Sequence, residues 1–412
     1  MIIDIINKKR LGLELSYQEL DYFFNGYLNG DVADYQMSSL LMAICINGMS
    51  DEEIFALTKI FIDSGDTLDL SFIPGNKVDK HSTGGIGDKT TLVIAPIVAS
   101  LGVSVVKMSG RGLGYTGGTI DKLESIPGFR IDLDDSEIIK QVSDIGVVVT
   151  GQTKDLVPMD KVIYALRDVT GTVSSIPLIA SSIMSKKIAG GADKILIDIK
   201  VGSGALLDNI RDAKKLEELM IKIGKVYNRE VRCIISDMNT PLGMNVGNGL
   251  EVLEAISVLK GECHNQGFVD LCVLLATNMV SMGLDISMDE AEKLVLDSIK
   301  SGKAYNKFLD LVKYQRGNID KIIISKNTLE VKAKSNGVVE AIDALEVGKL
   351  SLDLGAGKVK KEDKIDYGVG IVLNKTVSDK VKKGDVLYTI YYSKKIPKLD
   401  NYKIFTIKWF ML

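Results

Sequence analysis

Apolar residues recur at helical spacing through the first 65 positions of the chain. The two clearest groups are Leu40, Leu41, Ala43 and Ile44, and Ile54, Leu57, Ile60 and Phe61. Ser16 with Glu19, and Ser50 with Glu53, have the spacing of a helix capping box. We therefore predict that residues 1–65 are helical, with a break at Asn47-Gly48.

The pattern changes after Gly65, where short apolar runs alternate with longer segments of helical periodicity. The predicted strands are Val103–Met108, Val147–Thr150, Ile195–Lys200 and a fourth that contains Ile234. The predicted helices between them include Leu92–Leu101, Asp135–Ile145 and Asn209–Val226. This alternation predicts a largely parallel sheet with helices on its faces.

Two further regions depart from the alternation. Residues 158–190 are helical again and are expected to join the N-terminal helices, whereas the segment after residue 330 has short β-type runs such as Val338–Ile342 and Val386–Tyr392. The predicted fold class is α/β with a separate all-α lobe and a small α+β, β-rich C-terminal domain. The predicted limits are 1–65 plus about 158–190 for the α lobe, about 66–157 plus 191–330 for the α/β lobe, and 331–412 for the C-terminal domain.

Composition argues against several classes of partner and ligand. The 412 residues carry a net charge of −3, so no general basic surface points to nucleic acid, and any anion site must be local. The N-terminus lacks the long apolar region of a signal peptide, and no run reaches the roughly 20 apolar residues of a membrane span. Four scattered cysteines predict reduced thiols in a cytoplasmic protein, and two histidines argue against a histidine-rich metal site.

The richest chemistry lies between Val78 and Glu124, where three glycine-bearing segments, STGGIGD, SGRGLG and TGGT, are interleaved with hydroxyls and cations. Glycine allows close backbone approach, and exposed N–H groups, hydroxyls and cations together can hold an oxyanion such as phosphate. SGRGLG follows one predicted strand, and VGSG at 201–204 follows another. Both segments therefore stand where ligands bind in open α/β sheets.

The strings KHSTGGIGD, KMSGRGLGYTGGTIDKLESIPGF and YALRDVTGTVSSIPLIASSIMSKK resemble the thymidine/pyrimidine-nucleoside phosphorylase family, most closely its bacterial pyrimidine-nucleoside branch. The resemblance runs from the N-terminus to about residue 395. It implies direct attack of phosphate on the anomeric carbon of a pyrimidine nucleoside, which gives free base and a pentose 1-phosphate. It also implies phosphate as co-substrate, no organic cofactor and a homodimer formed through the α lobe.

The resemblance assigns phosphate binding to Lys80, Ser82, Thr91, Lys107, Ser109 and Thr119. Ammonium and hydroxyl groups suit this role because they form charge-assisted hydrogen bonds with phosphate. Lys80 as an exposed lysine and Ser109 as a turn residue are the structural alternatives. Lys107 is typical of the broad-specificity branch, and a lysine near the ribose would accept a 2′-hydroxyl. Uridine is therefore expected as a substrate beside thymidine and deoxyuridine.

The same resemblance assigns base binding to Arg167, Ser182 and Lys186, and Tyr164 is predicted to bind substrate beside them. Tyr164 and Arg167 are spaced i, i+3, and Ser182 and Lys186 i, i+4, so each pair shares one helical face. Two cations beside the base carbonyl oxygens would stabilise a departing pyrimidine anion. In the alternative interpretation, Arg167 caps its helix or pairs with Asp168, and Lys186-Lys187 is a charge pair at a helix end.

His81 stands inside the phosphate string, and the resemblance gives it a proton-donor or hydrogen-bonding role toward the base. The catalytic set implied by the resemblance is thus His81, Arg167, Ser182 and Lys186.

The resemblance further implies a potassium ion held by Gly87, Lys89, Leu242, Asn245 and Glu254. Lys89 departs from the small residue that relatives often carry there, and its ammonium would repel a bound cation. Tyr115 is a second departure, because the family commonly has histidine at this position. The apolar end Trp409–Leu412 is a third, and either packs on the β-rich domain or forms an apolar patch.

The sequence leaves three alternative functions open. A thymidine-restricted phosphorylase would share the strings but reject uridine. A phosphoribosyltransferase of the anthranilate type has a GTGGDG segment similar to STGGIGD and needs magnesium, but the YALRD…SIMSKK string has no purpose there. An inactive homologue would bind nucleoside and phosphate without turnover.

Overall fold

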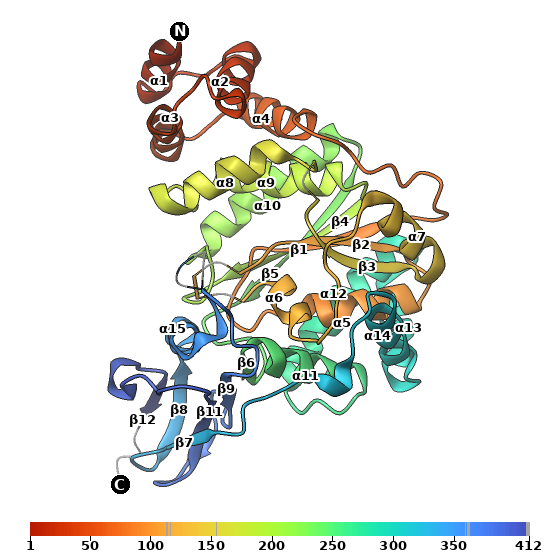
Figure 1. Cartoon of the computed structure of the whole chain (residues 1–412), viewed down its shortest axis with the longest axis vertical. Helices are drawn as coiled ribbons and strands as arrows, with labels where there is room; N and C mark the ends of the chain where they lie inside the picture. The colour runs from red at the N-terminus through yellow and green to blue at the C-terminus, as the bar shows by residue number, and fades with distance from the viewer. Residues whose placement is uncertain (113, 116, 154, 359, 361–362, 409–412) are drawn as a thin grey trace. The chain divides into compact units, whose positions relative to one another are not determined.

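The computed structural model describes residues 1–112, 114–115, 117–153, 155–358, 360 and 363–408 (Figure 1). Leu113 and Thr116 of the glycine-bearing segments, and the apolar end Trp409–Leu412, lie outside these described residues. The chain forms two compact units. The first comprises Met1–His81, Gln152–Ile197 and Asn209–Cys233, and the second comprises Ser82–Gly151, Asp198–Asp208 and Ile234–Leu412.

Helices dominate the first unit, as the periodicity predicts. They are α1 (Ile2–Arg10), α2 (Tyr17–Asn29), α3 (Asp34–Asn47), α4 (Asp51–Asp63), α8 (Pro158–Thr170), α9 (Ile176–Ala189) and α10 (Ile210–Val226). Helix α4 packs on α9, and α8 packs on α2, α3 and α4. Residues 158–189 therefore join the N-terminal helices, as expected.

The predicted capping boxes are both present, and one of them is part of a larger junction. Glu53 accepts hydrogen bonds from the backbone N–H groups of Ser50 and Leu15, each at 2.8 Å. Its carboxylate also receives the ammonium of Lys9 at 2.8 Å, and both side chains are almost fully buried. A single carboxylate thus ties together the end of α1, the segment before α2 and the start of α4.

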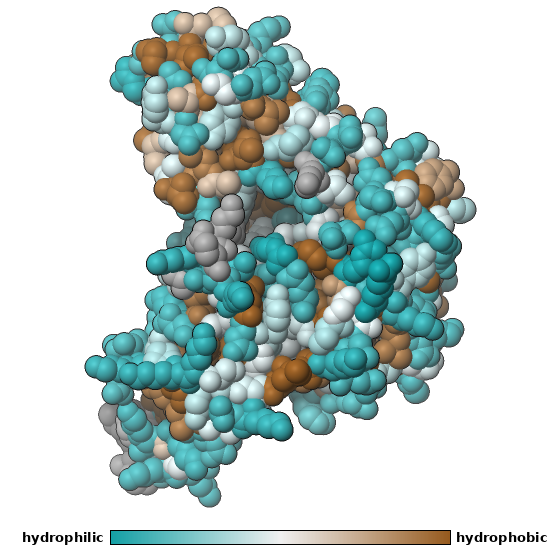
Figure 2. Space-filling view, viewed as in Figure 1, coloured by the Kyte–Doolittle hydropathy of each residue, from teal (hydrophilic) through white to brown (hydrophobic). Residues whose placement is uncertain are grey.

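Several large apolar side chains on the first unit remain exposed. On α3, Tyr35 is 74% exposed and Ile46 is 76% exposed, and Val169 on α8 is 79% exposed. Figure 2 shows brown, apolar side chains gathered over the N-terminal helices. Exposed apolar groups collected in one region are typical of an interaction surface.

The α/β part contains two sheets rather than the single one predicted. Strands β1 (Val78–Ser82), β4 (Lys194–Val201) and β5 (Glu230–Asp237) form one sheet in the order β1-β4-β5. In the second unit, β2 (Val105–Ser109) and β3 (Val147–Gly151) form a parallel pair, with Val105 opposite Val147 and Ser109 opposite Gly151. The predicted strand Val103–Met108 therefore begins two residues later and ends one residue later than expected.

Helices surround this pair of strands in the second unit. They are α5 (Thr90–Ser100), α6 (Thr119–Glu124), α7 (Asp135–Ile145), α11 (Asn248–Leu259), α12 (Gln266–Leu284), α13 (Met288–Lys300) and α14 (Lys303–Tyr314), followed by a short 3₁₀ turn at Ile319–Lys321. Helix α5 is buried from Thr90 to Ala99 and packs against α11, α12 and α14. It is therefore the central helix of the second unit.

Helix α12 corrects the expectation that no segment resembles a membrane span. By length and composition, its 19 residues could cross a membrane. Most of the helix is buried, however, and it packs against α5 and α13. It is a core helix of the second unit.

The C-terminal part is β-rich, as predicted. Strands β7 (Thr328–Lys332), β8 (Gly337–Ile342), β9 (Gly370–Leu373), β10 (Lys380–Val381), β11 (Val386–Tyr391) and β12 (Phe405–Lys408) are accompanied by α15 (Ala344–Ser351), a π-helical turn at Leu352–Ala356 and a 3₁₀ turn at Leu399–Asn401. One sheet has the order β10-β8-β12 and the other β6-β9-β11-β7. The strand β6 (Asn245–Val246) comes from far earlier in the chain and pairs antiparallel with β9.

We expect the substitution Glu53→Ala to lower the free energy of unfolding of the first unit by about 3–5 kcal/mol, because it leaves the buried ammonium of Lys9 unpaired. The matched control is Asp63→Ala on the same helix, whose pair with Lys59 is about half exposed. That substitution should change the same quantity by less than about 1 kcal/mol. Urea unfolding followed by circular dichroism measures both, and equal shifts for the two variants would contradict the assigned role of Glu53.

Candidate active site

The loop between β1 and α5, residues 82–89, is organised around the carboxylate of Asp88. The hydroxyl of Ser82 donates to one carboxylate oxygen of Asp88, and the backbone N–H of Gly84 donates to Ser82 Oγ at 3.1 Å. The other oxygen accepts from the backbone N–H of Thr90 at 3.2 Å and from its hydroxyl at 2.6 Å. Asp88 therefore joins the loop to the N-terminus of α5.

Glycine is required in this loop for steric reasons. Gly87 has a φ of +75°, and a Cβ there would lie 2.7 Å from the carbonyl oxygen of Leu242. A Cβ at Gly85 would lie 2.6 Å from the side chain of Met238. The glycines thus let the loop pack directly on the 238–242 segment.

The remaining phosphate candidates of the second unit come from three elements. Thr91 lies in the first turn of α5 and Thr119 begins α6. Lys107 and Ser109 lie on β2, where the ammonium of Lys107 donates to the carbonyl of Met108 at 2.9 Å. The hydroxyl of Ser109 is buried without a hydrogen-bond partner among the described residues. A buried hydroxyl in this state is available to a ligand.

Asp121, which the sequence did not single out, holds the described part of the loop after β2. Its carboxylate accepts from the backbone N–H groups of Gly112 at 2.6 Å and Gly118 at 3.1 Å. It also receives Arg111 Nη1 at 3.2 Å, and Arg111 forms a two-pronged ion pair with Glu124. The hydrogen bond to Glu124 raises the pKa of Arg111. Tyr115, the second departure from the family, is 47% exposed in this loop.

In the first unit, the predicted base-contact residues come together on α8 and α9. Lys186 Nζ lies 2.8 Å from Ser182 Oγ and 5.8 Å from the ring centroid of Tyr164. It also lies 2.5 Å from a carboxylate oxygen of Asp160, a residue that the sequence analysis missed. The spacing of Asp160 and Tyr164, i and i+4 on α8, is the signal that could have revealed it. The second carboxylate oxygen of Asp160 is buried with no hydrogen-bond partner in the described chain.

Arg167 lies beside this cluster, but its guanidinium is engaged by backbone. It donates to the carbonyls of Thr172 at 3.2 Å, Val173 at 2.8 Å and Leu178 at 3.2 Å, and it lies 5.6 Å from the ring of Tyr164. The alternative pairing with Asp168 is therefore wrong, and so is the capping role, because these carbonyls lie beyond the last turn of α8, which ends at Thr170. Burial lowers the pKa of Arg167 below its ordinary value and raises that of Tyr164.

Strand β1 carries Lys80 and His81 as part of the same unit. Lys80 is only 1% exposed, so the alternative of an exposed surface lysine is wrong. Beside it, Asp79 forms a buried ion pair with Lys187 at 2.6 Å. This pair fixes β1 against α9, the helix that bears Ser182 and Lys186.

The end of β4, just before the VGSG segment, has a supporting role that the sequence did not predict. The backbone N–H of Lys200 donates to the hydroxyl of Thr83 at 2.8 Å, and the backbone N–H of Thr83 donates to the carbonyl of Asp198 at 3.0 Å. The fully buried ammonium of Lys200 lies 2.7 Å from the carboxylate of Asp198 and 3.0 Å from Ser236 Oγ. The end of β4 thus braces the first glycine-bearing loop.

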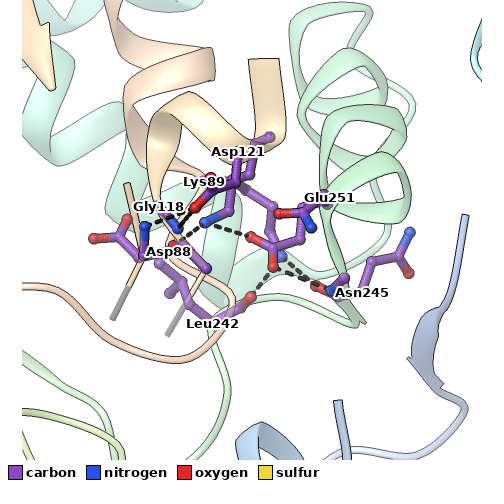
Figure 3. Close-up of polar contacts among 12 residues, drawn as sticks. Asp88, Lys89, Gly118, Asp121, Leu242, Asn245 and Glu251 are labelled. Atoms are coloured by element: carbon purple, nitrogen blue, oxygen red, sulfur yellow. Dashed lines mark hydrogen bonds and ion pairs between the residues drawn. The ribbon is translucent and has the colours of Figure 1, made fainter. Parts of the chain in front are cut away.

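The five residues to which the resemblance assigns potassium meet in the second unit, and Figure 3 labels Lys89, Leu242 and Asn245 among them. Lys89 Nζ lies 2.7 Å from the carbonyl oxygens of Leu242 and Asn245, and 2.7 Å from a carboxylate oxygen of Glu254. An ammonium group of the chain itself therefore lies among the assigned ligand oxygens. The residues present do not fit a separate monovalent cation bound to those three oxygens.

Comparison with known proteins agrees with the domain types. Residues 3–65 match the helical bundle domain of a glycosyl transferase family, and residues 74–305 match its a/b domain. Residues 338–402 match the pyrimidine nucleoside phosphorylase C-terminal domain.

Similar chains carry a consistent name. The pyrimidine-nucleoside phosphorylase of Staphylococcus epidermidis is 52% identical over 412 residues, covering 97% of this chain and 95% of that protein. Those of Staphylococcus haemolyticus and Staphylococcus aureus are 50% and 49% identical, with the same coverage.

The structure of anthranilate phosphoribosyltransferase from Thermus thermophilus superposes with a TM-score of 0.60. It covers 76% of this chain and all of that one, but at 18% identity it shows a shared fold alone. The chain belongs to the pyrimidine-nucleoside phosphorylase family of glycosyl transferases.

Proposed function

We propose that this chain catalyses the reversible phosphorolysis of uridine, thymidine and deoxyuridine, with inorganic phosphate as co-substrate and no organic cofactor. Phosphate attacks the anomeric carbon, the bond from that carbon to the base nitrogen breaks, and free base and a pentose 1-phosphate result. The observation that supports this most directly is the cluster of Asp160, Tyr164, Ser182 and Lys186. It offers a planar, polar base the partly exposed ammonium of Lys186, the hydroxyl of Ser182 and the ring of Tyr164.

The leaving group sets the main chemical demand on the base site. A pyrimidine departs as an anion whose charge spreads to its carbonyl oxygens, so a fixed cation beside those oxygens lowers the barrier. Lys186 supplies that cation, and Asp160 and Ser182 hold it at 2.5 and 2.8 Å. Arg167 adds a second positive charge nearby, and His81 serves as hydrogen-bond partner and proton donor to the base.

Phosphate binding draws on Lys80, Ser82, Thr91, Lys107, Ser109 and Thr119. The support for this proposal is their chemical type and the burial of Lys80, Thr91, Lys107 and Ser109, since a buried ammonium and hydroxyls form strong hydrogen bonds to a dianion. Ser109 is the clearest case, because its buried hydroxyl lacks a partner among the described residues. Lys107 is also proposed to accept the ribose 2′-hydroxyl and so to admit uridine.

We also propose that the protein is a cytoplasmic homodimer that associates through the α lobe. The exposed apolar side chains of α3 and α8, among them Tyr35, Ile46 and Val169, support that surface. All four cysteines lie in the described chain and none forms a disulfide there, in keeping with a reducing compartment.

The reaction itself is tested by the phosphate-dependent release of uracil from uridine and of thymine from thymidine, followed by ultraviolet absorbance. We expect both bases to be released without added magnesium. Thymine alone would overturn the assignment of Lys107, and a requirement for magnesium would favour the phosphoribosyltransferase alternative. No release while both ligands bind would indicate an inactive homologue.

The role of Lys186 is tested with Lys186→Met, which keeps the length of the side chain and removes its charge. We expect kcat/KM for uridine to fall by about 100-fold or more, because a preorganised charge at the leaving group is lost. Lys161→Met is the matched control, since Lys161 is an exposed lysine of α8. Similar kcat/KM values for the two variants would contradict the proposed base site.

The dimer surface is tested with Ile46→Glu, measured by size-exclusion chromatography with light scattering. We expect the wild-type protein to elute with twice the mass of the chain, and the variant to shift toward the monomer, because a charge enters an apolar contact. Lys140→Glu on α7 is the exposed control and should leave the mass unchanged. A wild-type monomer would overturn the proposal.

A further inference from the structure

The ammonium of Lys89, at the end of the first glycine-bearing loop, is fully enclosed in the second unit. The side chain is 0% exposed, and Nζ lies 2.7 Å from each of three oxygens. The ring of Phe268 closes the site from a further side, with its centroid 5.0 Å from Nζ. Two neutral carbonyls and one carboxylate accept the three N–H donors of the ammonium, and an aromatic face covers a further side.

The charge of this shell of oxygens is already balanced. The carboxylate of Glu254 accepts the backbone N–H groups of Met244 at 2.7 Å and Asn245 at 2.9 Å, and it pairs with Lys89. A second cation on the same oxygens would stand close to the ammonium, and like charges repel strongly in a buried site.

The surrounding backbone is shaped for this arrangement. A Cβ at Gly87 would lie 3.5 Å from Lys89 Nζ, and a Cβ at Gly243 would lie 2.6 Å from a carboxylate oxygen of Glu254. The Gly87 segment is therefore in van der Waals range of the ammonium, and the turn at Gly243 approaches the carboxylate of Glu254 too closely for any side chain at this position.

We propose that Lys89 is a built-in cation that replaces a bound potassium ion in this chain. The protein is then independent of added monovalent cations, and Lys89 acts as a positioning residue for the first glycine-bearing loop. Lys89 directly precedes α5 and follows Asp88, the carboxylate that orders Ser82 and Thr90. Fixing Lys89 thereby fixes the loop residues proposed to hold phosphate, and this part of the inference rests on the proposed function.

The experiment compares potassium chloride with choline chloride at equal ionic strength, and reads both the melting temperature and kcat/KM for uridine. For the wild-type protein we expect no rise in melting temperature with potassium, and kcat/KM values equal within about 2-fold. Lys89→Ser empties the shell and exposes its oxygens to solvent ions. In choline chloride its kcat/KM should fall by about tenfold or more, because the loop loses its position.

Potassium should then refill the shell of Lys89→Ser. We expect it to raise the melting temperature of that variant by about 3 °C or more, since a ligand that binds the folded state stabilises it. It should also restore much of the lost kcat/KM. Lys89→Met fills the space without charge and should be impaired but insensitive to potassium. Lys140→Ser, an exposed lysine of α7, should behave as the wild type.

Two results would overturn the inference. One is a wild-type protein whose melting temperature or activity rises with potassium as much as that of Lys89→Ser. The other is a Lys89→Ser protein that keeps wild-type stability and activity in choline chloride. If Lys89→Ser fails to fold, the inference is tested by the wild-type protein alone. A rise in its melting temperature or kcat/KM with potassium would then overturn the inference. If the wild-type protein releases no base, the melting temperatures still test the built-in cation while the proposed function fails.

Discussion

A single positive charge enclosed by the second unit joins two distant regions of its chain, the start of α5 and the segment 242–254. The ammonium of Lys89 links the start of α5 to the turn at 242–245 and to the carboxylate of Glu254 on α11. If the charge is removed, a buried carboxylate and two carbonyls lose their partner at the same time. Buried pairs of the same kind recur elsewhere, as in Lys9 with Glu53 and Lys187 with Asp79. Such pairs contribute little net stability but strongly favour one arrangement of the segments that they join.

The sequence predicted helices better than strands, for a physical reason. A capping box such as Ser50 with Glu53 is local, so its two residues specify the start of α4 without reference to the rest of the chain. A strand such as β6 has only two residues and exists because β9 pairs with it from more than a hundred positions away. The division of the predicted sheet into β1-β4-β5 and β2-β3 depends on the same kind of distant pairing, which periodicity does not encode.

The sequence predicted the cations and hydroxyls of the candidate site, but it did not predict the carboxylates that hold them. Lys186 and Ser182 stand in a matching string, but Asp160 becomes visible only when α8 and α9 pack together. Asp88 and Asp121 likewise look like ordinary polar residues in the sequence. Only the structure shows that they accept hydrogen bonds from backbone N–H groups and hydroxyls of the loops. The sequence named Arg167 but could not predict its partners. They are three backbone carbonyls, and every residue type has a backbone carbonyl.

The pairing of β6 with β9 has a consequence for synthesis on the ribosome. Asn245, whose carbonyl receives Lys89, belongs to a strand whose partner, Gly370–Leu373, is translated near the end of the chain. Until those residues emerge, the edge of β6 has no neighbour, and the turn beneath the first glycine loop lacks its support. Maturation of that loop is thus coupled to completion of the polypeptide, and an incomplete chain that stops before β9 would lack a supported loop.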